Sequence, residues 1–126
     1  MKLLIFLIGL TPFMLNQGND LIGITRAISD GNASALSQYF DQSVEIAVLE
    51  QENIYSKTQA VKVIDSFFSS NKPLSFSKVH EGTSKGSDSQ YCIGNLRTNG
   101  STFRVYIYAK SNAGKYLIQE LRFDKE

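Results

Sequence analysis

The first helix is predicted by apolar residues that recur at helical spacing. Leu21, Ile24 and Ile28 are separated by three and four residues, so they fall on one face of a helix. Asp20 is expected to cap the start of this helix, because a short polar side chain can accept from the free N–H groups there. Gly31 is expected to end it.

A second short helix and a strand are predicted next. Asn32 is the expected N-cap of this helix, which carries Leu36 and Phe40. Over residues 44–48 the larger apolar side chains occupy every second position, which is the period of a half-buried strand.

The clearest helix is predicted to begin at Ser56. Ser56 and Gln59 have the spacing of a capping box, and Tyr55 occupies the position of a hydrophobic staple. Asn71 and Pro73 are expected to end the helix. One face collects the apolar residues Ala60, Val63, Ile64, Phe67 and Phe68.

After Pro73 the apolar period changes to two, which is typical of strands. The predicted strands are 74–81, 89–98, 102–110 and 115–123. Asn99-Gly100 predicts a tight hairpin turn in which both residues take positive φ. Short connections favour antiparallel neighbours. The order α-α-β-(β)-α-β-β-β-β therefore predicts an α+β fold, with helices packed on one face of a strongly curved antiparallel sheet.

Alternation along the strands predicts which side chains face the helices. The inner set is Val44, Ile46, Val48, Phe76, Phe103, Val105, Ile107, Ala109, Leu117, Leu121 and Phe123. The outer set is Arg104, Tyr106, Tyr108, Tyr116, Ile118, Glu120 and Arg122. For residues 89–98 both assignments stay open.

The first residues have the pattern of a signal peptide. Lys2 precedes a mainly apolar run over residues 3–15, shorter than the roughly 20 residues that span a bilayer. We therefore expect a signal peptide over residues 1–18, one domain over 19–126, and no membrane span after cleavage. The protein would then be exported, to the periplasm or outside the cell. The alternative is a buried N-terminal helix or an uncleaved anchor.

Composition and charge exclude several kinds of binding site. The 126 residues carry a net charge of +1 without a basic cluster, which argues against nucleic-acid binding. A single cysteine, Cys92, excludes an internal disulfide and fits a small buried apolar side chain. A single histidine excludes a multi-histidine metal site, and we expect neither a metal nor a cofactor.

Several short segments together resemble a known superfamily. They are Gly31-Asn32-Ala33, Leu36, Phe40, Tyr55-Ser56, Ala60, Phe67-Phe68, His80-Glu81-Gly82, Tyr91-Cys92-Ile93-Gly94 and Phe103-Arg104-Val105-Tyr106. In this order they look like the nuclear transport factor 2-like, or cystatin-like, cone fold. More narrowly, the chain resembles a family of small exported bacterial proteins known only as a domain of unknown function. The resemblance implies a helix-lined cone around a concave sheet, often dimeric through that sheet. The superfamily holds isomerases, dehydratases and hydrolases beside non-catalytic members.

Four residues are candidates for a pocket in the cone: His80, Tyr55, Phe76 and Phe67. His80 has the same strand parity as Phe76, so we expect it at the mouth of the cone. A neutral imidazole there would suit a general base, because its pKa lies near neutrality. The simpler interpretation is a hydrogen-bonded histidine at a strand end.

Five residues are candidates for an interface on the outer sheet face. Tyr106, Tyr108 and Tyr116 would form its centre, with Arg104 and Arg122 at the rim. Glu120 and Arg104 are interpreted either as a cross-strand ion pair or as a ligand clamp.

Our leading hypothesis is therefore a non-enzymatic exported binding or scaffold domain that uses the cone pocket, the outer face, or both. Its expected partners are a small apolar ligand, a second copy, or another exported protein. The competing hypothesis is a small-molecule isomerase, dehydratase or hydrolase with His80 as its base.

Overall fold

The structure is a computed structural model that describes residues 17–84, 86 and 88–126, with side chains from residue 20 onward. The predicted signal peptide falls almost wholly outside these residues, so its cleavage site stays a prediction. The elements are α1 Gln17–Asp30, α2 Ala33–Ser37, β1 Phe40–Val48, β2 Gln51–Ser56, α3 Lys57–Ser70, β3 Pro73–Thr83, β4 Ser89–Thr98, β5 Thr102–Asn112 and β6 Lys115–Lys125.

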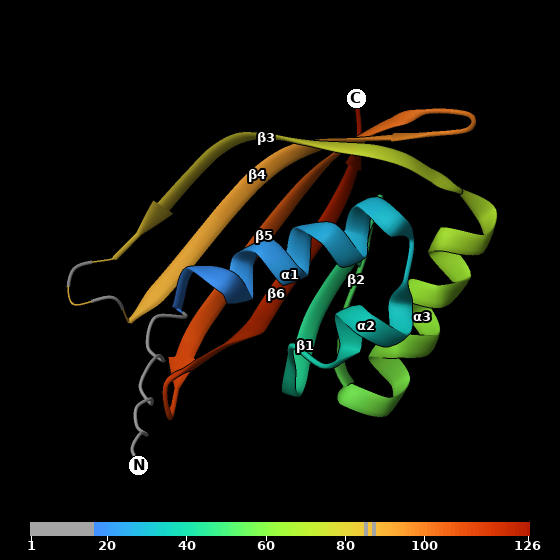
Figure 1. The fold of residues 1–126 in the computed structure, drawn as a ribbon. Helices are drawn as coiled ribbons and strands as arrows, with labels where there is room; N and C mark the ends of the chain where they lie inside the picture. Colours follow the sequence, from blue (N-terminus) through green and yellow to red (C-terminus); the bar gives the residue numbers. More distant parts are fainter. Residues whose placement is uncertain (1–16, 85, 87) are drawn as a thin grey trace, which may run out of the picture.

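The strands form one curved sheet of six strands in the order β2-β1-β6-β5-β4-β3. The helices cover its concave face, with α1 lying across the strands and α3 near the end of the sheet where β3 begins (Figure 1). This confirms the predicted α+β architecture. One pair differs from the expected antiparallel sheet, because β1 and β6 run parallel. Short turns govern only strands that follow each other in the chain, and between these two lie α3 and four further strands.

The helix ends form largely as the sequence predicts. Gly31 has φ of 66° and its N–H donates to Ile28 O, while Asn32 N–H reaches back to Ala27 O, which is a Schellman ending. Asn32 Oδ1 accepts from Ala35 N at 2.9 Å as an N-cap. Ser56 Oγ accepts from Gln59 N at 3.3 Å and begins α3.

Two of the expected positions near the first helices are wrong. Asp20 lies inside α1 instead of capping it, because the helix already begins at Gln17. Its Oδ2 accepts from the backbone N–H of Tyr116 at 2.9 Å and so ties α1 to β6. Phe40 belongs to β1, where it is buried, and not to the second helix.

The core lies between the helices and the concave face. Its centre is an aromatic cluster in which the Phe67 ring lies 4.4 Å from that of Phe123 and 5.1 Å from that of Phe103. Phe68 completes the cluster, with a centroid 6.4 Å from Phe123. These rings pack against one another between α3 and the sheet.

Two β-bulges reverse the facing of side chains along their strands. In β3, Lys78 pairs with Gly94 and His80 with Ile93, so Val79 is an extra residue. In β6, Ile118 pairs with Ala109 and Glu120 with Tyr108, so Gln119 is extra. After Val79 in β3 and before Gln119 in β6, the side chains face opposite to the direction that alternation predicts.

The predicted hairpin between β4 and β5 forms, but its turn differs from the expected one. Neither Asn99 nor Gly100 takes a positive φ. Instead, Thr98 Oγ1 accepts from Ser101 N at 3.0 Å and donates to Ser101 O at 2.7 Å, which closes a longer turn. The tight turn with two positive φ values is at Ala113 and Gly114, between β5 and β6.

Candidate functional site

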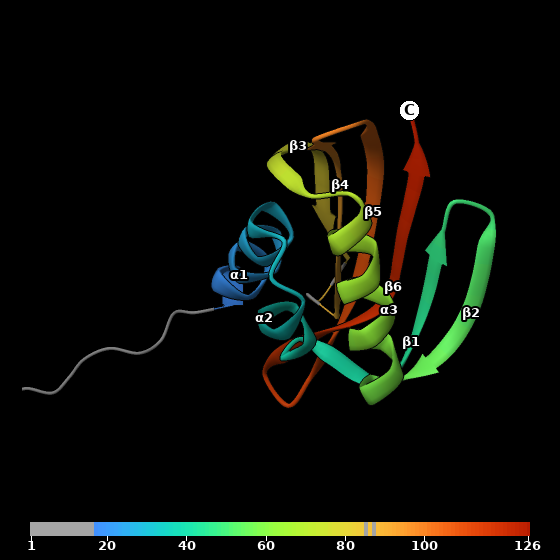
Figure 2. The ribbon, with the colours of Figure 1, turned by 90° about the vertical axis from the view of Figure 1, so that its right-hand side faces the viewer.

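An open apolar groove runs between α3 and the β1–β2 hairpin, which extends beside that helix (Figure 2). Two adjoining cavities of about 490 and 320 Å³ form it, and Val48 and Val63 line both of them. Two of the predicted pocket residues lie here, since Phe67 lines the larger cavity and Tyr55 the smaller one. We call this feature the α3 groove.

The wall of the α3 groove at the hairpin tip is unusual. Leu49 has φ of 58°, a left-handed conformation that costs a branched residue roughly 1–2 kcal/mol. Its side chain is 47% exposed although it is apolar. Sequence patterns alone do not reveal this position, because nothing near Leu49 resembles a turn that requires positive φ.

A second candidate surface is the outer face of the sheet. Tyr108 pairs with Tyr91, and Tyr106 pairs with Ile93, across β5 and β4. All four side chains point away from the helices, because the alternating residues Cys92 and Ile107 are buried in the core. We call Tyr91, Ile93, Tyr106 and Tyr108 the tyrosine patch. For residues 89–98 the sequence left the facing undecided, and in the structure Tyr91 and Ile93 point outward.

Carboxylates flank the tyrosine patch on the side of β6, β1 and β2. Glu120 lies opposite both Tyr108 and Glu45, so it joins the patch to the acidic residues. Arg122 Nη1 lies 3.7 Å from both Glu52 Oε1 and Glu120 Oε2. A hydrogen bond with the Glu52 carboxyl, together with desolvation and the charges of Glu120 and Glu52, raises the pKa of Glu45.

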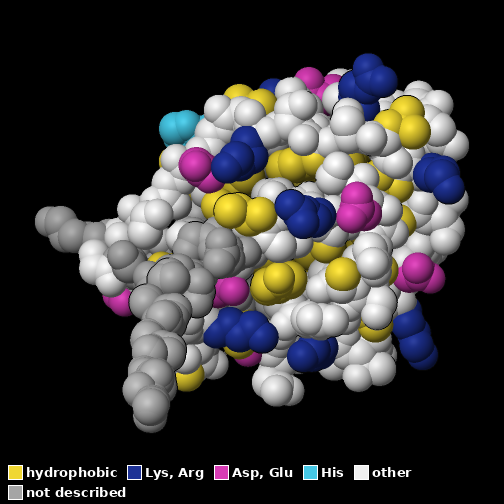
Figure 3. All heavy atoms as spheres, viewed as in Figure 1, with side chains coloured by type: hydrophobic (Ala, Val, Ile, Leu, Met, Phe, Trp, Pro, Cys, Tyr) yellow, Lys and Arg dark blue, Asp and Glu magenta, His cyan; other side chains and the backbone are white. Residues whose placement is uncertain are grey.

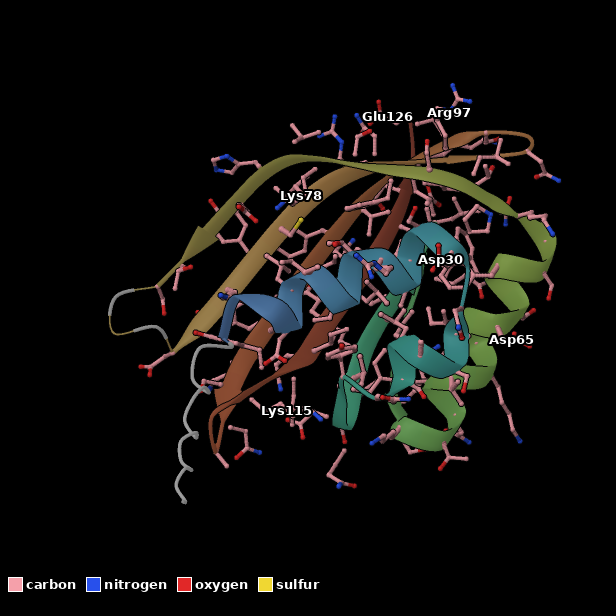
Figure 4. The ribbon with its side chains drawn as sticks, viewed as in Figure 1. Asp30, Asp65, Lys78, Arg97, Lys115 and Glu126 are labelled. Atoms are coloured by element: carbon pink, nitrogen blue, oxygen red, sulfur yellow. The ribbon has the colours of Figure 1, made fainter. Side chains whose placement is uncertain are left out.

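Arginines lie beyond the patch along its own strands, β5 and β4. Arg104 Nε donates to Asn95 Oδ1 at 3.1 Å and lies 3.2 Å from Glu126 Oε2. The expected pairing of Arg104 with Glu120 is wrong, because register places Arg104 opposite Asp124. Arg97 lies at the same end of the sheet as Glu126 (Figure 4).

His80 does not point into the cone. The bulge at Val79 turns it to the outer face, opposite Ile93, so the parity shared with Phe76 does not hold. Its side chain is exposed, and Nε2 lies 2.7 Å from the hydroxyl of Tyr91. His80 therefore does not lie at the mouth of the cone, where we expected a general base.

Tyr116 does not belong to the tyrosine patch either. The bulge at Gln119 turns Tyr116 and Ile118 to the core side, where they are 2% and 0% exposed. Gln119 Nε2 donates to Asp41 Oδ2 at 2.7 Å, which holds the bulge and lowers the pKa of Asp41. Leu117, expected on the inner face, is only half-buried.

A polar cavity of about 390 Å³ occupies the mouth between the start of α1 and the end of β3. Lys78 and Glu81 line it and pair with each other, with Nζ 3.1 Å from Oε1. Figure 4 shows Lys78 on β3 above helix α1. Gln90 Oε1 is buried at this cavity and has no partner within the described part of the chain.

Phe76 and Cys92 pack against the sheet and the core. The Phe76 ring lies over Gly94, at a place where any Cβ would collide with it. Cys92 is fully buried, and that burial raises the pKa of its thiol to about 11, so the thiol is inert.

The helix-covered face carries charges of both signs. Figure 3 shows hydrophobic side chains on both sides of α1, with basic and acidic residues interspersed among them. Within residues 17–84, 86 and 88–126, no three acidic, cysteine or histidine side chains are grouped to hold a metal ion. No helix in this same part of the chain is long and apolar enough to cross a bilayer.

Solved structures similar to this chain include three proteins of one family from Bacteroides. The protein from Bacteroides fragilis YCH46 is 31% identical over 83% of this chain and 97% of its own, with a TM-score of 0.79. That from Bacteroides ovatus ATCC 8483 is 30% identical over 82% and 93%, with a TM-score of 0.78. An NTF2-like protein of unknown function from Silicibacter pomeroyi DSS-3 is 11% identical over 86% and 92%, with a TM-score of 0.64.

At 11% identity, the likeness to the Silicibacter pomeroyi protein shows the fold alone. No curated protein matches the sequence. A family model, the domain of unknown function DUF4783, matches residues 22–124, and the Bacteroides structures are described as members of the same family. The chain therefore belongs to the DUF4783 family and has the NTF2-like fold.

Proposed function

We propose that this protein is a non-enzymatic exported binding domain whose outer sheet face pairs with a second copy of the chain. The observation that carries the proposal is the tyrosine patch. Four neighbouring apolar or aromatic side chains, Tyr91, Ile93, Tyr106 and Tyr108, lie together on the outer face. Glu120 and Arg122 of β6 border them on one side, and Asn95 and Arg104 follow them along β4 and β5. Tyrosine is enriched in interface cores, where charged residues are depleted.

The charges around the patch favour a second copy as the partner. Glu45, Glu52 and Glu120 lie on β1, β2 and β6, whereas Arg97 and Arg104 lie on β4 and β5. The carboxylates lie beside the patch across the sheet, and the two arginines lie beyond it along its own strands. A two-fold axis in the plane of the face and oblique to the strands would therefore bring the carboxylates of one copy opposite the arginines of the other. Such self-complementarity is what an isologous interface requires.

The proposal of export rests on the first residues, where Lys2 precedes an apolar run too short to span a bilayer. The proposal of a non-enzymatic role is supported by His80, the sole histidine of the sequence. It lies on the outer face beside a tyrosine hydroxyl and not beside a carboxylate in a cavity.

Sedimentation of the purified protein tests the association. We expect a dimer, and we expect the double variant Tyr106→Glu/Tyr108→Glu to be monomeric, because two unpaired carboxylates would be buried in the interface. Circular dichroism must show that this variant is folded. Lys57→Glu/Thr58→Glu, at exposed positions on α3, is the matched control and should remain dimeric.

Ionic strength provides a measurement that does not depend on folding of the variant. If opposite charges align the two faces, the dimer should weaken as salt is raised. A wild-type protein that sediments as a monomer at high concentration overturns the proposal.

A further inference from the structure

We propose that the α3 groove binds a single-chain amphiphile with a carboxylate head, of the fatty-acid class, with the head at Lys62 and the chain against Val48, Leu49 and Val63. The inference goes beyond self-association, since this groove lies on the concave side of the sheet and the tyrosine patch lies on the other.

The lining of the groove suits an apolar chain. Its floor consists of core side chains, among them Phe67 and Ile46, which are 6% and 1% exposed. Its hairpin wall is Val48 and Leu49. The two adjoining cavities have the size and the mainly apolar character of small-molecule sites.

The head group is indicated by charge. Lys62 is the one charged side chain among the described residues that line either cavity. Ser66 and Ser70 follow it at intervals of four residues along α3, so their hydroxyls lie on the same helix face. A carboxylate at Lys62 would gain a cation and a hydroxyl donor, whereas an ammonium head would be repelled.

Leu49 supplies a second, independent observation. Glycine would fit its positive φ without strain, and the leucine side chain is still half-exposed in the folded chain. Backbone strain of this kind concentrates at binding sites, where another molecule completes the contacts. An apolar chain in the groove would cover the exposed isobutyl group of Leu49.

A peptide fits this groove less well than an acyl chain. Each peptide group would bring an N–H and a C=O that must be paired along its whole length. The floor at Phe67 and Ile46 is apolar, and the polar side chains that line the groove beside Lys62 are few: Gln51, Tyr55, Ser66, Ser70 and Asn71. An acyl chain needs polar partners only at its head, which is where Lys62 and Ser66 lie.

Calorimetric titration of the purified full chain tests the inference with three probes below their micelle concentrations. We expect dodecanoate to bind, and octanoate to bind more weakly by roughly two- to fourfold for each methylene lost from the groove. Dodecyltrimethylammonium has the same chain and the opposite charge, so it should bind at least fivefold more weakly than dodecanoate. Equal affinity for the two dodecyl probes, or no binding of dodecanoate, overturns the proposal.

Two variants with matched controls locate the site. Lys62→Gln should weaken dodecanoate binding about three- to fivefold and abolish the preference for the anion, whereas Lys57→Gln on the same helix should not. Leu49→Gly should weaken binding about fivefold or more without lowering the thermal midpoint, because it removes contact and strain together.

Ala113→Gly, at the other non-glycine residue with positive φ, is the control for the effect of backbone relief and should leave binding unchanged. Unchanged binding by Leu49→Gly, or equal losses in the two lysine variants, would show that the amphiphile binds elsewhere. Both results are separate from the dimer measurement, which reports on the opposite face of the sheet.

Discussion

At the scale of single residues, Phe67 shows how one side chain on α3 supports the packing of helix against sheet. Its ring touches Phe68, Phe103 and Phe123 and is 6% exposed. We expect Phe67→Ala to lower the free energy of unfolding by roughly 3–5 kcal/mol, since the neighbouring rings cannot close the cavity. Urea denaturation measures this, with Lys57→Ala as an exposed control that should change stability by less than about 0.5 kcal/mol. A midpoint equal to wild type would mean that the cluster does not form.

Glu45 is a residue whose charge opposes folding. Because its pKa is raised in the folded protein, the native state holds this proton to higher pH than the unfolded chain does. Its contribution to stability is therefore largest below the ordinary pKa of glutamate and is lost as pH rises through the raised value. At pH 7 the ionised group is repelled by Glu52 and Glu120.

Glu45→Gln should accordingly raise the urea midpoint at pH 7, and the gain should vanish near pH 4, where glutamate itself is largely protonated. Glu50→Gln, at the exposed β1–β2 turn, is the control and should give a smaller change at pH 7. The same gain at both pH values would attribute the effect to something other than charge.

At the scale of elements, the tight turn with positive φ forms at Ala113-Gly114 and not at Asn99-Gly100, where the sequence predicts it. Ala113 has φ of 55°, which asparagine tolerates far better than alanine, while Asn99 does not take positive φ. We expect Ala113→Asn to stabilise the protein by about 0.5–1 kcal/mol, and Asn99→Ala to change stability by less than about 0.5 kcal/mol. Thermal unfolding of both variants measures the contrast, and a larger cost for Asn99→Ala would contradict the assigned turns.

Alternation and capping patterns placed most of the helices and strands, because each is a local signal. They misplaced the start of α1 and the position of Phe40, and they gave no bounds for β2. The facing of the side chains after Val79 and of those before Gln119 was not predictable in the same way. A bulge adds one residue to a strand without any change of local pattern, and its position depends on the partner strand. The misplacement of His80 and of Tyr116 follows directly from these two residues.

The candidate sites were predictable only in part for a related reason. Tyr106 and Tyr108 lie on a strand without a bulge between them, so their shared outward direction follows from period two. Tyr55 and Phe67 do reach a groove, yet its remaining wall comes from the hairpin at Leu49. The distance between α3 and that hairpin is set by tertiary packing, and local sequence patterns do not predict it.

At the scale of the whole molecule, the proposal of export predicts the intact mass of the mature protein. If the first residues are a signal peptide, the protein purified from its native host should lack residues 1 to about 18. Measurement of the intact mass decides this, and a full-length chain produced without the export machinery provides the reference. A native mass that still includes Met1–Leu15 would instead indicate an uncleaved anchor or a retained helix.

The edges of the sheet decide what kind of assembly the molecule can build. β2 is a short edge of six residues, and β3, the opposite edge, is interrupted by the bulge at Val79 and begins with Pro73, which has no N–H to donate. Irregular and short edges resist the addition of a further strand, which is how open fibrils grow. In a two-fold pair, by contrast, each copy has only one such sheet face, and the partner covers it, so no third copy can bind there. The extra residue Val79, which turns His80 to the outer face, thus also makes this edge unsuited to strand addition. A dimer formed through the sheet faces, as proposed above, would then stay a closed pair and would not grow into a fibril.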